Sequence, residues 1–217
     1  MKPVVVVLAA PSGGGKTTIA RALVARWPDK YGFSVSATTR APRPGEREGD
    51  AYFFLPRGEF ERRREAGEFL EWAEYAGELY GTLRREVDRL LAGGRHVLLD
   101  IEVQGARQVR RQYPRPASRA VFILPPSAAE LLRRLERRRT EAASERAKRL
   151  ETAIRELAQA ETFDHVVVND DLDTAVATVH EIVEAPDSAP APTRAAANRE
   201  RIKALIVELK KLTKEIS

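Results

Sequence analysis

The feature that most limits the fold of this chain is a short apolar run that leads into a glycine-rich turn. Residues 4–9 (VVVVLA) precede this turn, and a helical pattern follows it as far as residue 26. In such a strand–loop–helix unit, backbone N–H groups and the helix dipole can surround phosphate oxygens. We therefore expect a nucleoside triphosphate to bind at Pro11, Ser12, Gly13, Gly14, Gly15, Lys16, Thr17 and Thr18.

The side chains that close the turn suit that chemistry. Lys16 is expected to reach the β- and γ-phosphates, and the Thr17 hydroxyl is expected to bind Mg²⁺. Ala10 stands where such loops usually have their first glycine, so its backbone has to adopt a conformation open to alanine. The loop alone does not distinguish between ATPases, GTPases and kinases, because many enzymes share it.

Short apolar runs alternate with helical patterns along the rest of the chain. Strands are predicted at residues 95–100, 120–124 and 165–168, and helices at 103–113, 128–138 and 144–160. This alternation predicts an α/β fold with a parallel sheet covered by helices. Residues 36–82 depart from it, with an arginine- and proline-rich loop and strand-like segments at 52–55 and 69–75 around one short helix. They predict an inserted subdomain for a second substrate.

Composition narrows the class of protein. The 217 residues are 43% hydrophobic and 32% charged and include no cysteine, which predicts a soluble, cytoplasmic protein without disulfides. The net charge of +5 is spread among interleaved acids, as in residues 59–71, so we expect neither nucleic acid nor membrane as a partner. The three histidines, far apart in sequence, are expected to be ordinary surface or edge residues.

Several blocks together resemble the guanylate kinases, in family order and spacing, from about residue 3 to 184. The blocks are 33–46 (FSVSATTRAPRPGE), 49–54, 69–73 (FLEWA), 80–82 (YGT), 100–106 (DIEVQGA), 122–127 and 168–172 (VNDDL). The resemblance implies ATP and GMP as substrates, Mg²⁺ as cofactor, and a kinase core with an inserted GMP-binding subdomain and a helical lid. The alternatives are a kinase for another nucleoside monophosphate and a non-catalytic guanylate-kinase-like binding module.

The resemblance also implies a GMP site. Arg40, Arg43, Tyr52 and Tyr80 would hold the GMP phosphate, and guanidinium forks suit a dianion. The carboxylate of Glu71 would accept from guanine N1–H and the 2-amino group, with Ser36 and Thr82 near the base. Asp100 and Glu102 would bind Mg²⁺ through water or contact GMP; we assign Asp100 to the metal and Glu102 to GMP.

For the ATP side, the resemblance implies lid arginines at Arg134, Arg138 and Arg149 and an adenine contact at Asn169. Lys16, Arg43 and the lid arginines would cancel charge on the transferring phosphoryl group. Arg137-Arg138-Arg139 replaces the usual Gly-Arg-Gly of the family, which could stiffen the lid turn. Asp170 and Asp171 are expected to cap the helix that follows.

The C-terminal part lies outside the resemblance. Residues 185–193 are a Pro/Ala-rich linker, and 194–217 predict an amphipathic helix with apolar residues at 202, 205, 209, 212 and 216. Its lysine content differs from the arginine-rich body, which favours a separately appended module. Self-association, docking onto its own chain and a loosely helical end are the alternatives. The predicted organisation is core at 1–35, 83–125 and 161–184, GMP-binding insertion at 36–82, and lid at 126–160.

Overall fold

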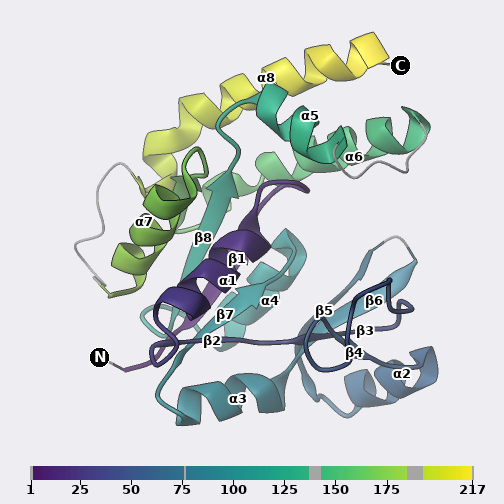
Figure 1. The fold of residues 1–217 in the computed structure, drawn as a ribbon, viewed down its shortest axis with the longest axis vertical. Coiled ribbons are helices and arrows are strands. Elements are labelled where there is room, and N and C mark those ends of the chain that lie inside the picture. The colour runs from purple at the N-terminus through teal and green to yellow at the C-terminus, as the bar shows by residue number, and fades with distance from the viewer. Residues whose placement is uncertain (1, 76, 137–142, 185–192, 217) are drawn as a thin grey trace. The chain divides into compact units, whose positions relative to one another are not determined.

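The computed structural model describes residues 2–75, 77–136, 143–184 and 193–216 (Figure 1). The chain forms two compact units. The first unit consists of Met1–Val7 and Leu23–Arg119, and the second of Leu8–Ala22 and Ala120–Ser217. The predicted insertion therefore belongs to the first unit, and the glycine-rich turn to the second.

The larger sheet has the strand order β2-β7-β1-β8-β9. Its strands are β1 (Val5–Ala9), β2 (Tyr31–Phe33), β7 (His96–Asp100), β8 (Ser118–Leu124) and β9 (His165–Val168). β2 runs parallel to β7 in the first unit, and β8 runs parallel to β9 in the second. Every residue of β1 and β8 is buried, as expected of parallel strands that are covered on both faces. The predicted α/β fold is confirmed.

Helices connect these strands. They are α1 (Lys16–Arg26), α3 (Arg84–Ala92), α4 (Val103–Gln112), α5 (Ala128–Glu136), α6 (Ala143–Leu157) and α7 (Leu172–Glu184). Asp171 caps α7, because its carboxylate accepts hydrogen bonds from the backbone N–H of Thr174 at 2.8 Å and from its hydroxyl at 2.7 Å. These bonds lower the pKa of Asp171. Of the two aspartates predicted to cap this helix, Asp171 is therefore confirmed.

A second sheet of the first unit has the order β4-β3-β6-β5. It consists of β3 (Ser36–Thr38), β4 (Phe53–Phe54), β5 (Phe69–Tyr75) and β6 (Glu78–Leu83), with α2 (Arg57–Glu65) between β4 and β5 in the chain. Its own core contains Ala37, Phe60, Phe69, Leu79 and Leu83, and the rings of Phe60 and Phe69 stack at 4.3 Å. This small core gives the predicted insertion a rigid base on which polar side chains can be placed.

The C-terminal segment packs within the second unit. After the short helix η3 (Ala195–Asn198), α8 (Arg199–Ile216) lies along α5 and α6 (Figure 1). Three residues of the apolar face of α8 are buried, because Ile202, Leu205 and Leu209 are at most 4% exposed. Burying each such side chain stabilises a fold by about 1.5–3 kcal/mol. The structure therefore has the predicted amphipathic helix docked on its own chain.

One of the histidines differs from the prediction of a surface or edge residue. His96 is 6% exposed in β7, an inner strand of the larger sheet, whereas His165, 2% exposed, lies in the edge strand β9. The ring nitrogen Nδ1 of His96 accepts a hydrogen bond from Val4 N at 3.1 Å, and Nδ1 of His165 lies 3.0 Å from the Thr193 hydroxyl. Within the described residues, no helix combines the length and apolar character needed to span a membrane.

Candidate functional site

The glycine-rich turn of the second unit has the shape of an anion-binding loop. Gly13 and Gly15 adopt φ angles of +82° and +93°, which favour glycine. A Cβ atom on Gly14 would lie 2.7 Å from the Ala10 Cβ, and Gly14 N donates to Pro11 O at 2.7 Å. Each glycine is thus required for a local reason, and Ala10 is accommodated because Gly14 leaves room for its methyl group.

Four polar side chains of the second unit lie at this loop or bond to its neighbours. The Asn169 side-chain amide donates to Gly14 O at 3.0 Å, and Arg134 Nη2 donates to Asn169 O at 3.2 Å. Glu130 accepts from Arg134 Nε at 2.6 Å, which fixes the direction of the guanidinium. The carboxylate of Glu156 accepts from Ser12 N at 3.2 Å. The structure therefore brings the loop, Asn169 and Arg134 together, as a triphosphate site needs.

The remaining residues predicted on the ATP side lie on helices. Lys16 is the first residue of α1 and is half-buried, and Thr17 and Thr18 follow it as exposed residues. Arg149 is a half-buried residue of α6. Arg138, with its neighbours Arg137 and Arg139, lies outside the described residues.

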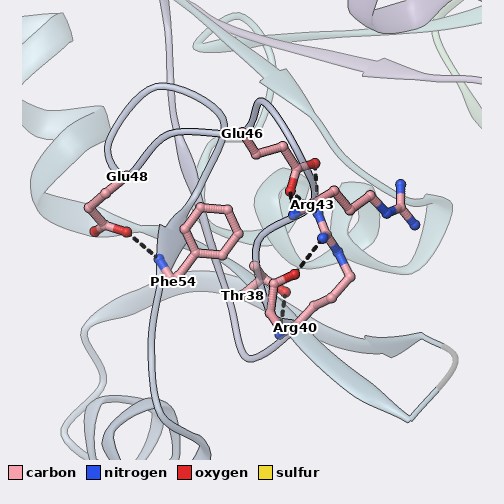
Figure 2. Close-up of polar contacts among 7 residues, drawn as sticks. Thr38, Arg40, Arg43, Glu46, Glu48 and Phe54 are labelled. Atoms are coloured by element: carbon pink, nitrogen blue, oxygen red, sulfur yellow. Dashed lines mark hydrogen bonds and ion pairs between the residues drawn. The ribbon is translucent and has the colours of Figure 1, made fainter.

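In the first unit, a carboxylate organises the arginine-rich loop (Figure 2). Arg40 Nη2 donates to both oxygens of Glu46 at 2.9 Å, and Arg43 N donates to the same carboxylate at 2.8 Å. Burial lowers the pKa of Arg40, but its bonds to Glu46 and Tyr80 outweigh this and raise it. The Arg43 side chain is exposed and points away from Glu46 in Figure 2. The loop thus holds one guanidinium in place and presents a second one.

Two tyrosines stand beside this loop. The rings of Tyr52 and Tyr80 meet edge-on at 6.0 Å, and the guanidinium of Arg40 lies over the Tyr52 ring at 5.4 Å. Burial, followed by the negative charge of Asp100, raises the pKa of Tyr52. The phenol therefore stays protonated and can donate a hydrogen bond. The structure brings Arg40, Tyr52 and Tyr80 together in the first unit.

The side chain of Glu71 is buried in the second sheet. An irregularity in β5 between Phe69 and Glu71 shifts the register, so that Glu71 lies opposite Thr82 and Thr82 in turn lies opposite Ser36. The Thr82 hydroxyl donates to Glu71 Oε1 at 2.7 Å, and Glu71 is 5% exposed. These three residues form one row of polar groups across β3, β6 and β5.

The buried carboxylate carries an unusual proton affinity. Burial raises the pKa of Glu71 from the ordinary value of 4.5 to about 7, the Thr82 hydrogen bonds work against this, and the charge of Glu102 adds to it. Glu102 sits at the N-terminal end of α4, half-buried. The hydrogen bonds from Thr82 do not offset the cost of burying the charged carboxylate. Such a group is suited to a ligand that donates further hydrogen bonds to it.

The oxygen donors predicted for Mg²⁺ fit that ion chemically. Thr17 offers a hydroxyl and Asp100 a carboxylate, which are hard ligands, and Mg²⁺ typically keeps waters and substrate phosphates as its other ligands. In the described part of the chain, no group of three or more histidine, cysteine, aspartate or glutamate side chains could hold a metal by itself. Thr17 and Asp100 each offer an oxygen ligand of the kind that Mg²⁺ prefers.

The structure adds residues that the sequence patterns did not single out. Glu46 holds Arg40, Glu156 holds the glycine-rich loop, and Gly105 lies against the Glu71 carboxylate. The short spacing of Glu46 from Arg40 was a usable signal, since an acid six residues from an arginine in a loop can fold back on it. Glu156 and Gly105 are far from their partners in sequence and had no such signal.

Comparisons with known proteins find matches along most of the chain. The sequence profile of the family described as guanylate kinase matches residues 1–186. A guanylate kinase of Synechococcus elongatus is 50% identical over 172 residues, which are 79% of this chain and 92% of that protein. One of Rubrobacter xylanophilus is 49% identical over 178 residues, covering 82% and 92%. The crystal structure of guanylate kinase from Anaplasma phagocytophilum is 33% identical with a TM-score of 0.69 and covers 93% of this chain and 94% of that one.

Proposed function

Because the chain belongs to the guanylate kinase family, we propose that it transfers the γ-phosphate of ATP to GMP and releases ADP and GDP. The observation that carries this proposal is the buried Glu71 carboxylate with its Thr82 hydrogen bond. The organisation that we propose assigns GMP to the subdomain at 36–82, ATP to the glycine-rich loop, and a lid to residues 126–160.

The Glu71 carboxylate makes the site prefer guanine to adenine. Guanine presents two donors, N1–H and the 2-amino group, whereas adenine has a lone pair at N1 and no 2-amino group. With adenine at this position the buried carboxylate would keep its Thr82 hydrogen bond but would lack the two donors of guanine, which costs far more than a lost contact in water. Ser36, two strands away in the same row, would donate to guanine O6, and Glu102 would contact GMP.

The arginine-rich loop supplies the phosphate site. Arg40 and Arg43 provide two guanidinium groups, and Tyr52 and Tyr80 provide phenolic donors. The anionic Glu46 pairs with Arg40. The pKa of Glu46 is lowered, first by the hydrogen bond from Arg43 N and then by the contacts with Arg40. A GMP phosphate would compete with Glu46 for Arg40, so the guanidinium is kept in position and charge-balanced before the substrate binds.

The reaction is an in-line displacement. An oxygen of the GMP phosphate forms a bond to the γ-phosphorus while the bond from that phosphorus to the bridging oxygen of ADP breaks, and the electron pair leaves with ADP. The attacking oxygen is already anionic, so no protein base is required. Lys16, Arg43, Arg134, Arg138 and Arg149 cancel negative charge as the phosphates approach. Thr17, and Asp100 through water, would hold Mg²⁺, and the ion would supply positive charge against the phosphates of ATP.

A coupled assay of ADP release tests this proposal. ATP is supplied with GMP, AMP, UMP or dTMP, and GMP is expected to be the fastest acceptor by a wide margin. A different preferred acceptor would contradict the assignment of the base site. No turnover with any acceptor would favour the non-catalytic binding module. Free nucleotides as substrates agree with the cytoplasmic location that the sequence predicts.

A further inference from the structure

One face of α4 lies against β5 at the position of Glu71. Gly105, Gln108 and Gln112 are three and four residues apart, so they share a side of this helix. α4 and β5 are in contact, and both belong to the first unit. None of these three residues carries a charge. Gly105 lies against the Glu71 side chain of β5, whereas Gln108 and Gln112 bond the backbone of that strand.

The two glutamines hold the backbone on both sides of Glu71. Gln108 Nε2 donates to Trp72 O at 2.8 Å, and Gln108 Oε1 accepts from Trp72 N at 3.3 Å. Gln112 Nε2 donates to Leu70 O at 2.7 Å. β5 is an edge strand of its sheet, so its outer backbone groups have no neighbouring strand to bond. The glutamines take the place of that strand and fix the residues before and after Glu71.

Gly105 leaves the space that the carboxylate occupies. A Cβ atom at this position would lie 2.3 Å from Glu71 Oε2 and 2.9 Å from Glu71 Cδ. Both distances are shorter than a van der Waals contact, so any side chain at residue 105 would move the carboxylate itself. Gly105 is the third residue of α4, and glycine is a poorer helix former than alanine. Its presence in α4 is accounted for by the carboxylate rather than by the helix.

We propose that Gly105, Gln108 and Gln112 are positioning residues that set the guanine selectivity of the site by fixing where the Glu71 carboxylate points. They act through Glu71 and do not touch the substrate. One oxygen of Glu71 is held by Thr82 from β6, and the other lies over the backbone of α4 at Gly105. The carboxylate is thereby held between two elements. This inference rests on the proposed function, in which Glu71 reads the base.

The test compares full-length variants by steady-state kinetics with ATP and GMP, and with AMP as the competing acceptor. Gly105→Ala should raise the GMP KM by about 10- to 100-fold, the range expected when a charged hydrogen bond is misplaced. The ATP KM should change less than about twofold. Gln108→Ala should raise the GMP KM in the same direction by a smaller factor. Gln104→Ala is the matched control, because Gln104 is an exposed glutamine of the same helix.

A double-mutant comparison separates positioning from general packing. In a Glu71→Ala background the methyl group of Ala at residue 105 meets no carboxylate, so adding Gly105→Ala should leave the GMP KM within about twofold. An equal rise in both backgrounds would overturn the proposal, as would a wild-type GMP KM for both Gly105→Ala and Gln108→Ala. If Glu71→Ala itself keeps full preference for GMP over AMP, the role of Glu71 in the proposed function fails instead.

Discussion

Replacing Glu71 by glutamine should stabilise the protein at alkaline pH while removing the group that reads the base. The pKa of Glu71 rises from 4.5 to about 7 because the carboxyl group is buried. Between these values the folded protein holds a proton that the unfolded chain has lost, so the free energy of unfolding falls as pH rises through this window. At about 1.4 kcal/mol per pH unit, the full cost above pH 7 is about 3 kcal/mol.

Urea denaturation of ligand-free wild type and Glu71→Gln at two pH values measures this cost. The variant, which cannot ionise, should be more stable by about 1 kcal/mol at pH 5 and by about 3 kcal/mol at pH 8. The second figure corresponds to roughly 6–12 °C in Tm for a chain of this size. Glu74→Gln, an exposed glutamate of the same strand, should show no such gain. A Glu71→Gln advantage that is absent at pH 8, or equal at both pH values, would refute the reasoning.

Three further outcomes are expected. Lys16→Ala should lower kcat by about 10²-fold or more, as the loss of a group that stabilises transition-state charge does, with the GMP KM nearly unchanged in steady-state assays. Leu209→Asp should lower the free energy of unfolding by more than about 3 kcal/mol, because it places a charge on the buried face of α8. In the same denaturation experiment the control Val207→Asp, at a position that is 51% exposed, should change the free energy of unfolding by no more than about 0.5 kcal/mol. Asp171→Ala should cost about 1 kcal/mol in thermal unfolding through the lost cap of α7, and no change would contradict the cap.

Local patterns predicted the strongest elements of the fold. β9 was expected at residues 165–168 and β5 at 69–75, and both have these bounds. The helix after the glycine-rich turn was expected as far as residue 26, and α1 ends at Arg26. Each of these segments carries its own signal, either an unbroken apolar run or a loop whose glycines are required by backbone geometry. These segments could be predicted without knowing which other segments pack against them.

The missed strands depend on distant partners. β3 is only three residues long and polar, and it is a strand because β6 lies on one side and β4 on the other. β6 contains Gly81, which breaks its apolar pattern, yet a Cβ atom there would lie 2.8 Å from Phe69 Cδ1. The glycine is thus a consequence of packing between strands. No local pattern reveals this requirement.

The same reasoning applies to the site. The predicted chemistry of Arg40, Tyr52, Glu71 and Thr82 followed from residue types and from family resemblance, and the structure brings each of them into a polar cluster of the first unit. The residues that hold these groups in place were not predicted. Gln108 bonds a strand more than thirty residues away in sequence, so its role depends on tertiary structure alone.

The ratio of kcat/KM for GMP to kcat/KM for AMP, measured in wild type and in Glu71→Gln with saturating ATP, tests the base-reading role of the buried carboxylate most directly. Loss of a paired buried acceptor predicts a fall of about 100-fold or more in this ratio, with the ATP KM preserved. A ratio that stays at the wild-type value in a folded Glu71→Gln protein would show that the guanine ring is selected elsewhere.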